Sequence, residues 1–368
     1  MPARYRTRPN TYTIGRGLRL NTWNTQTVLL TWSDTCSDVT GSPGVDHTFV
    51  KTKGWTNGAV LSGDNGQVGI LRRLYDNYPP NGAGPGIGSA PAVNAQALIT
   101  SLLAKANPST ASVQLPVFIF ELRELPRLIL LAGRSIAGKF ASANLAYQFG
   151  WKPLLGDLTK LFNFQDAVNR RVKDLERLQS GSGLRKRKTL GRYEGTVTQN
   201  NVYMESLISS VVAEMSTVTT QEIWGTVRWF PNPLNLPQTD EERLKHARRL
   251  VLGMTWGQQL SNLWEALPWS WLVDWCVNVQ DFIEASNNTL TAPSPRVNLM
   301  IRTKAVRTYR ITSKPSWVQC NPASPVWSYE RKERIPSVGI PSFQISLPFL
   351  TNGQLSILGS LAILRRKG

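Results

Sequence analysis

The sequence predicts an α+β fold in which a multi-helix bundle is inserted into an antiparallel β-sheet region. Segments rich in Val, Thr, Trp and Gly lie at the beginning, middle and end of the chain, and helical periodicity fills the two intervals between them. With 368 residues the chain exceeds the usual limit of a single hydrophobic core. We therefore expect two structural regions.

The first segment, residues 1–114, is predicted to be β-rich. Its clearest strand signal is the run of Thr, Val, Leu and Trp at 22–32, which lies between turn residues. A cluster of Pro and Gly at 79–88 follows and predicts a linker loop, since no Gly-Lys-Ser/Thr sequence accompanies it. Helical periodicity then begins with a short helix near 90–106.

The second segment, residues 115–190, is predicted to be helical. A long helix is expected over 121–147, and an apolar seam of alternating four and three spacing follows it. The seam consists of Leu154, Leu158, Leu161, Val168, Val172 and Leu175. Ser and Gly at 180–183 predict the end of this helix.

The third and fourth segments are predicted to be β-rich over 191–237 and helical over 238–290. Val, Thr, Tyr and Ile dominate the β-rich part, and prolines close it. Thr239 followed by Glu242 has the spacing of a capping box, so a helix should begin there and run toward Leu263.

Pro268 predicts the start of a second helix in the fourth segment, which Asn287 and Asn288 should end. The last segment, 291–368, is predicted to be β-rich to its end. Within it, apolar side chains fall on odd positions from 297 to 311 while Arg and Lys occupy even ones, the pattern of one long strand.

Charge indicates the kind of partner. Lys and Arg total 42 against 24 Asp and Glu, a formal net charge of +18, and such a field favours a polyanion. Nucleic acid fits better than an anionic membrane, because the sequence offers neither a basic amphipathic membrane helix nor a lipid anchor. We also expect no membrane span, since no apolar run reaches about 20 residues.

Cysteines and the amino terminus indicate the compartment. Cys36, Cys276 and Cys320 are odd in number and far apart, so neither a disulfide framework nor a zinc site is predicted, and a reducing compartment fits best. The first 20 residues carry five Arg without the apolar stretch of a signal peptide.

Three clusters of cations are the candidate RNA-binding residues. They are Arg170, Arg171, Lys173 and Arg177; Arg185, Lys186, Arg187 and Lys188; and Arg243, Lys245, Arg248 and Arg249. The second cluster carries the strongest prediction, because four adjacent cations repel one another and gain most when a phosphate backbone displaces their counterions. For the first, a solvated helix face with i,i+4 ion pairs is the alternative. In the third cluster, the negative charges of Glu241 and Glu242 offset part of the positive charge.

Catalysis is not predicted. Asp274, Asn278 and Asp281 share a helix face, but capping and pairing with Arg explain them as well as a carboxylate site does. The chain has two His, so general acid and base chemistry has few candidates. We therefore predict no catalytic residue, metal or cofactor. Trp269, Trp271 and Trp275 could stack bases, but their helical spacing favours a buried core stripe.

Two stretches, residues 147–158 and 267–281, resemble the maturation proteins (A proteins) of the leviviruses, the single-stranded RNA bacteriophages. The family's second stretch often reads Trp-Phe followed by Asn-Val-Gly-Asp, and Cys276 and Gln280 stand here in place of Phe and Gly. The residues that carry the resemblance are Trp151, Pro153, Asp157, Pro268, Trp269, Trp271, Asp274 and Trp275.

The resemblance implies a bent, elongated virion protein, made in the bacterial cytoplasm and present in one copy per particle. It would replace a coat protein dimer in the shell and hold the phage genomic RNA, with 3′-terminal stem-loops as the expected ligands. Its outward part would bind a retractile host pilus, and the protein would enter the cell with the RNA. We expect the receptor surface on the β-rich part, in loops at 41–69 and 315–325, and no single receptor residue is predicted.

Two other functions stay open at this stage. One is an RNA-binding protein, cellular or phage, without a receptor role, although no RRM or KH pattern is present. The other is inhibition of a host cell-wall enzyme that leads to lysis, as some relatives in the family cause.

Overall fold

The chain forms two compact units, each built from three separate segments. Unit 1 comprises Met1–Asn94, Thr189–Gly225 and Asn298–Ser337, and unit 2 comprises Ala95–Lys188, Thr226–Val297 and Val338–Gly368. The structure is a computed structural model. It describes residues 3–19, 23–39, 47–57, 59–73, 90–112, 144, 147–148, 152, 163–180, 183–205, 210–232, 235–254, 274, 278–288, 290–292, 295–342 and 352–365.

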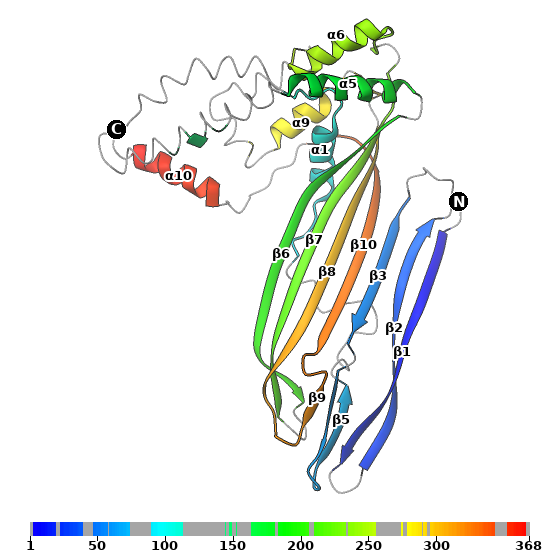
Figure 1. Ribbon diagram of the computed structural model, residues 1–368, viewed down its shortest axis with the longest axis vertical. Coiled ribbons are helices and arrows are strands. Elements are labelled where there is room, and N and C mark those ends of the chain that lie inside the picture. Colours follow the sequence, from blue (N-terminus) through cyan, green and yellow to red (C-terminus); the bar gives the residue numbers. More distant parts are fainter. Residues whose placement is uncertain are drawn as a thin grey trace. The chain divides into compact units, whose positions relative to one another are not determined.

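Long antiparallel strands dominate the described chain (Figure 1). Their bounds are β1 Ala3–Arg19, β2 Trp23–Val39, β3 Phe49–Thr56, β4 Val60–Asp64, β5 Gly69–Arg73, β6 Leu184–Glu205, β7 Val211–Trp229, β8 Arg296–Ser313, β9 Gln319–Asn321 and β10 Val326–Val338. The hydrogen-bonded order is β6-β7-β8-β10-β3-β2-β1-β5-β4-β9. Strands from the beginning, middle and end of the sequence therefore lie next to one another, and β10 pairs with β3.

Period-two patterning explains why β7 and β8 are strands. In β7 every second residue from Val211 to Gln221 is buried, and in β8 Val297, Leu299 and Ile301 are buried. Such alternation places one face of each strand in the interior and the other outside. The predicted strand over 297–311 is confirmed, and it extends to the full range of β8.

A cluster of buried hydrophobic residues stabilises unit 1 where the short strands meet. Leu61, Ile70, Val211 and Val318 are fully buried there, and Met204, Ile311, Trp317 and Cys320 pack against them. Each buried aliphatic side chain contributes about 1.5–3 kcal/mol relative to exposure. Burial of this cluster therefore helps to fix the ends of β4, β5 and β7.

Five helices are described, and all of them belong to unit 2. They are α1 Ala95–Ala106, α5 Phe164–Gln179, α6 Asp240–Val251, α9 Val279–Ser286 and α10 Asn352–Arg365 (Figure 1). Helix α5 buries Val168, Leu175 and Leu178, a stripe at helical spacing that continues the predicted apolar seam. None of the described helices is long and apolar enough to cross a membrane.

The capping box at the start of α6 is confirmed. The Thr239 hydroxyl accepts a hydrogen bond from the Glu242 backbone N–H at 3.2 Å, and the Glu242 carboxylate accepts from the Thr239 N–H at 3.2 Å. These bonds satisfy donors that the first helical turn leaves free. The helix ends earlier than predicted, however, because Leu252 is its C-cap and Gly253 has φ +70°.

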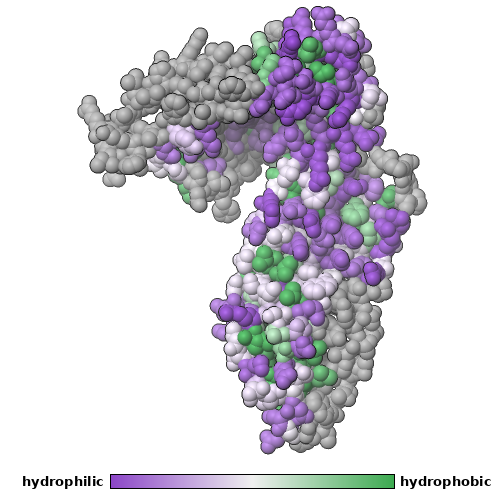
Figure 2. Space-filling model, in the orientation of Figure 1, coloured by the Kyte–Doolittle hydropathy of each residue, from purple (hydrophilic) through white to green (hydrophobic). Residues whose placement is uncertain are grey.

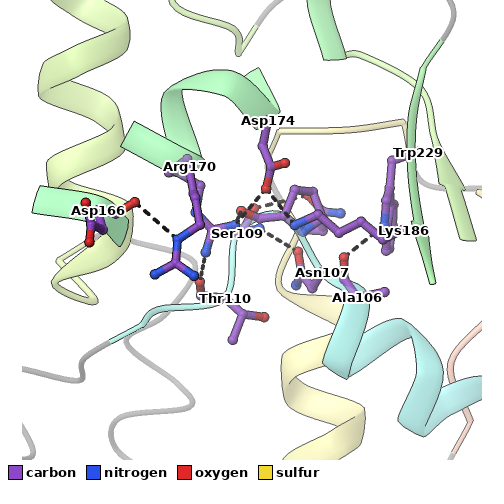
Figure 3. A network of polar contacts seen from close by, with 12 residues as sticks. Ala106, Asn107, Ser109, Thr110, Asp166, Arg170, Asp174, Lys186 and Trp229 are labelled. Atoms are coloured by element: carbon purple, nitrogen blue, oxygen red, sulfur yellow. Dashed lines mark hydrogen bonds and ion pairs between the residues drawn. The ribbon is translucent and has the colours of Figure 1, made fainter. Parts of the chain in front are cut away.

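The loop that follows α1, residues 107–112, is held by partners from distant parts of unit 2. The Asn107 side chain donates to the Glu284 carbonyl of α9 at 2.6 Å, and the Ser112 N–H donates to the Val251 carbonyl of α6 at 3.1 Å. At the helix end just before the loop, the Trp229 indole N–H of β7 donates to the Ala106 carbonyl at 3.1 Å (Figure 3). Backbone groups without helix or strand partners are thus satisfied.

The predicted multi-helix bundle is wrong. The described chain is mostly strand, and its helices are five short ones of 8 to 16 residues. Much of the helical periodicity behind that prediction lies at 115–162 and 255–277, where the structure describes only residues 144, 147–148, 152 and 274. Inside them, β6 begins at Leu184, so the strand takes over residues that had been assigned to the helical segment 115–190.

Two further expectations about helices are corrected. The helix predicted to run from Pro268 to Asn287 is interrupted, because Asn278 is the N-cap of α9. The last segment, expected to be β-rich to its end, contains α10 at Asn352–Arg365. Short runs of Leu, Ile, Ala and Ser fit a strand or a helix equally well by pattern, and the good helix formers Leu and Ala decide here for helix.

Candidate nucleic-acid interface

Helix α5 presents a stripe of cations on the side opposite its buried seam. Arg170, Lys173 and Arg177 are exposed and follow one another at i, i+3 and i+7. The Arg170 side chain donates to the backbone carbonyl of Asp166 at 3.2 Å (Figure 3). This contact is a hydrogen bond to the backbone and not an ion pair with the Asp166 carboxylate. The amphipathic helix thus directs its cations outward.

The basic run at 185–188 forms the start of β6 and not the end of a helix. Arg185, Arg187 and Lys188 are exposed, whereas only 19% of the Lys186 side chain is exposed. The Lys186 ammonium lies 2.9 Å from the Asp174 carboxylate of α5 (Figure 3). Successive strand residues point to opposite faces, which explains why Lys186 turns away from Arg185 and Arg187.

Arg171 serves inside unit 2 as well. Its guanidinium donates to the Pro108 and Thr110 carbonyls, both at 2.6 Å, and lies 4.0 Å from the Asp174 carboxylate. Burial lowers the pKa of Arg171, and the negative charge of Asp174 opposes this shift. Burial is also the main cause that lowers the pKa of Lys186, and the Arg171 charge adds to it. Arg171 and Lys186 therefore make internal contacts and are not part of the exposed cationic surface.

Helix α6 divides its cations in the same way. Arg243 pairs with Asp240 and lies 3.8 Å from the Glu176 carboxylate of α5, with 20% of its side chain exposed. Lys245, Arg248 and Arg249 are exposed on the other side of the helix from Ala247 and Leu250. Arg243 therefore joins α6 to α5 while its three neighbours face solvent.

Nine of the twelve predicted RNA-binding side chains are exposed, and all nine belong to unit 2. They are Arg170, Lys173, Arg177, Arg185, Arg187, Lys188, Lys245, Arg248 and Arg249. We call this set the unit 2 cations. Hydrophilic side chains cover α5 and α6 in Figure 2, consistent with a solvated, charged surface.

The acidic residues near the unit 2 cations are largely engaged in local structure. Asp240 pairs with Arg243, and Glu176 lies near the same guanidinium. The Glu242 carboxylate accepts from the Gln238 and Thr239 backbone N–H groups, and these hydrogen bonds lower its pKa. The acids thus offset only part of the positive charge, and the surface keeps a positive balance.

Most of the residues that carry the family resemblance lie outside the described residues. These are Trp151, Pro153, Asp157, Pro268, Trp269, Trp271 and Trp275. Asp274 is described, and its carboxylate accepts from the Gln280 backbone N–H at 3.0 Å. It therefore supports the first turn of α9, in line with the capping interpretation.

Asn278, the second residue of that polar stripe, also has a structural role, because its side chain donates to the Ser342 carbonyl at 3.3 Å. Burial raises the pKa of the neighbouring Glu284 carboxyl. Over the described ranges, no group of three or more His, Cys, Asp or Glu could hold a metal ion.

A second cluster of cations, which the sequence analysis did not single out, lies in unit 1. Arg6 and Arg8 of β1 and Lys51 and Lys53 of β3 line a cavity of about 290 Å³. The available signal was the alternation of Lys51, Lys53 and Trp55, which predicts one face of a strand. Their proximity to β1 depends on strand order, which the sequence does not reveal.

Comparison with protein-family models found no match, and a search of curated proteins found none either.

Proposed function

We propose that this protein binds the genomic RNA of a single-stranded RNA bacteriophage through the unit 2 cations and acts as its maturation protein. The observation that carries RNA binding is the exposure of nine cations in one unit, while Arg171, Lys186 and Arg243 are kept for internal contacts. The resemblance of residues 147–158 and 267–281 to the levivirus family supplies the more specific role.

Binding by this surface is entirely non-covalent. Each phosphate that a Lys or Arg neutralises releases counterions, and this release supplies affinity without reading sequence. The cations come from two helices and one strand, so their fixed positions favour an RNA whose backbone has a matching shape. The resemblance supplies 3′-terminal stem-loops as the proposed ligand, and the proposed binding involves no catalytic residue, metal or cofactor.

The proposal includes two further partners. One copy would replace a coat protein dimer in the shell, and the β-rich part would bind a retractile host pilus before the protein enters the cell with its RNA. Exposed turns between the strands of unit 1 suit this second role, because surface turns tolerate change without disturbing a core.

A map of the phage particle, reconstructed without imposed symmetry, tests the proposal directly. We expect one copy of the chain to interrupt the coat lattice, with α5, α6 and the start of β6 on RNA. A particle whose shell is fully symmetric, or in which these elements touch only coat protein, would contradict the assignment. Purified protein that binds its genomic RNA but is missing from particles would support RNA binding alone.

A further inference from the structure

One face of strand β3 carries two neighbouring lysines with an aromatic ring on either side of them. Lys51, Lys53 and Trp55 are exposed on it, and 51% of the Trp55 surface is accessible. Phe49 lies on the same face because it too is an even number of residues away, and the Arg334 guanidinium of β10 stacks over its ring at 5.9 Å. Thr56, the residue that follows Trp55 in the strand, is buried on the opposite face.

Strand register brings further cations to this face. Arg6 of β1 pairs with Cys36 of β2, Cys36 pairs with Lys51 of β3, and Lys51 pairs with Lys332 of β10. Side chains of directly opposed residues lie on the same side of a sheet, so Arg6, Lys51 and Lys332 form one row across four strands. Arg8 lies two residues beyond Arg6 and therefore points the same way.

The acids on this face are already occupied. Asp38 accepts two hydrogen bonds from Arg4, at 2.9 and 2.7 Å, and one from Arg6 at 2.8 Å. The Asp34 carboxylate accepts from the Gly54 backbone N–H at 2.9 Å. Glu330 of β10, opposite Lys53, accepts from Arg302 at 2.6 Å and lies 3.4 Å from the Lys332 ammonium, so Lys332 is itself ion-paired. Among the described residues, Arg8, Lys51 and Lys53 form no ion pair. The cavity that these three cations and Arg6 line therefore keeps a net positive charge.

We propose that this surface, the β3 face, formed by Arg6, Arg8, Lys51, Lys53 and Trp55, binds an unpaired stretch of RNA. The cations would contact successive phosphates and Trp55 would stack on a base. A half-exposed Trp beside unpaired cations is the combination that single-strand binding uses, because every base has a face to stack and the backbone needs neutralising. Paired bases hide those faces inside a helix, so a duplex could use only the cations.

The β3 face differs from the surface of the proposed function in unit, strand and form of RNA. Because the proposed function turns the β-rich part toward the pilus, this face would meet RNA when the protein enters the cell with it, and not inside the shell. RNA, as opposed to another single strand, rests on that proposed function. An acidic protein could also use the cations, and Trp is enriched at protein interfaces as well. Nucleic acid is favoured because Trp55 lies beside several cations along one strand, an arrangement that matches a phosphate backbone with its bases, and Trp55 provides the test.

The experiment measures the affinity of the full chain for a fluorescent oligouridylate of roughly 12 nucleotides, a length within known single-strand site sizes. Gln at Arg185, Arg187 and Lys188 provides a background in which the unit 2 cations contribute less. In that background Trp55→Ala should weaken binding about 5- to 150-fold, with an unchanged salt dependence. Trp55→Tyr should retain most of the affinity, because Tyr also stacks.

The lysines are tested by the salt dependence. Lys51→Gln with Lys53→Gln should reduce the slope of log affinity against log salt by about 1.4, which is two phosphates of a single strand. The matched control is Arg192→Gln with Arg310→Gln, which removes the same charge from unit 1 at exposed positions next to Glu194 and Glu214. The control should leave the slope nearly unchanged.

Three results would overturn the inference. The first is normal oligouridylate binding by a Trp55→Ala variant that melts like the parent protein. The second is an equal loss in the control and in the lysine variant, which would assign binding to the general field. The third is a Trp55→Ala or double lysine variant that loses binding to polyglutamate while it still binds oligouridylate. That result would assign the surface to an acidic protein. Stem-loop binding through the unit 2 cations is measured separately and stands or falls independently.

Discussion

Lys186 of β6 and Asp174 of α5 form an ion pair with 2.9 Å between ammonium and carboxylate, although Lys186 belongs to a run of four cations. Asp174→Asn leaves the Lys186 ammonium largely buried without its counter-charge, so we expect the free energy of unfolding to fall by about 1–3 kcal/mol. Urea denaturation measures this. Lys173→Gln, an exposed change on the same helix, should stay within about 0.5 kcal/mol. Equal stability of the two variants would show that the pair contributes nothing.

The same pair changes what the basic run can do for RNA. Replacing Arg185, Arg187 and Lys188 by Gln should reduce the slope of log affinity against log salt for a 3′-terminal stem-loop by roughly 2–3, since three phosphates lose their partners. Lys186→Gln should leave that slope unchanged and lower stability instead. Filter binding over a series of salt concentrations separates the two effects. A slope that responds to Lys186 but not to its neighbours would reverse the assignment of faces.

Stability should fall on mild acidification because of His246 in α6. Its Nε2 atom is buried without a hydrogen-bond partner among the described residues, and burial, followed by the Arg249 charge, lowers its pKa. As pH falls below the ordinary value of about 6.5, the unfolded chain binds this proton first. The contribution is therefore complete above about 6.5 and is lost through the window between that value and the lower folded pKa.

His246→Gln should flatten this dependence, and unfolding by denaturant at several pH values between about 5.5 and 7.5 measures it. Lys173→Gln, the exposed change on α5, is the control and should retain the dependence of the parent protein. If the parent and the His246 variant lose stability in parallel, another group is responsible.

Receptor attachment should depend on turns of unit 1. The stretch 41–69 is less loop-rich than expected, because it contains β3 and β4. Among the described residues of that stretch, the turn after β4 is exposed, and in it the Asn65 side chain accepts from the Gln67 and Val68 N–H groups. A second exposed turn follows β9, at residues 322–324.

We expect substitution of these turns to reduce the number of particles bound to purified pili while the packaged RNA stays constant. Changes to Lys245 and Arg248 on α6 should do the reverse and reduce packaged RNA. Attachment that survives both turn substitutions but fails with the α6 variant would place the receptor surface on the helices.

Local signals made part of the fold predictable. The capping box of Thr239 and Glu242 and the alternation of β8 each depend on residues a few positions apart, and both are confirmed. The exposed cations of α5 could be identified for the same reason, since one helix places them and its buried seam orients it.

What sequence could not show depends on contacts between distant residues. Arg171 lies on the seam side of α5, between Val168 and Leu175, and its carbonyl partners Pro108 and Thr110 are 63 and 61 residues away. Lys186 was grouped with Arg185 because a charge run carries no period, so helix and strand could not be told apart. The row formed by Arg6, Lys51 and Lys332 depends on register between strands of different parts of the chain.

The loop at 107–112 has a consequence for the order of synthesis. Its distant partners lie later in the chain. The Asn107 side chain cannot form its hydrogen bond to the Glu284 carbonyl until that residue, 177 positions downstream, has been synthesised. At about 5–20 residues per second, a ribosome needs roughly 9 to 35 s to cover that distance. During that interval α1 has left the ribosome without α9. The amino-terminal part of unit 2 therefore cannot mature as it emerges, and truncation before residue 284 should yield a chain whose α1 is digested readily by protease, however well β1 and β2 have paired.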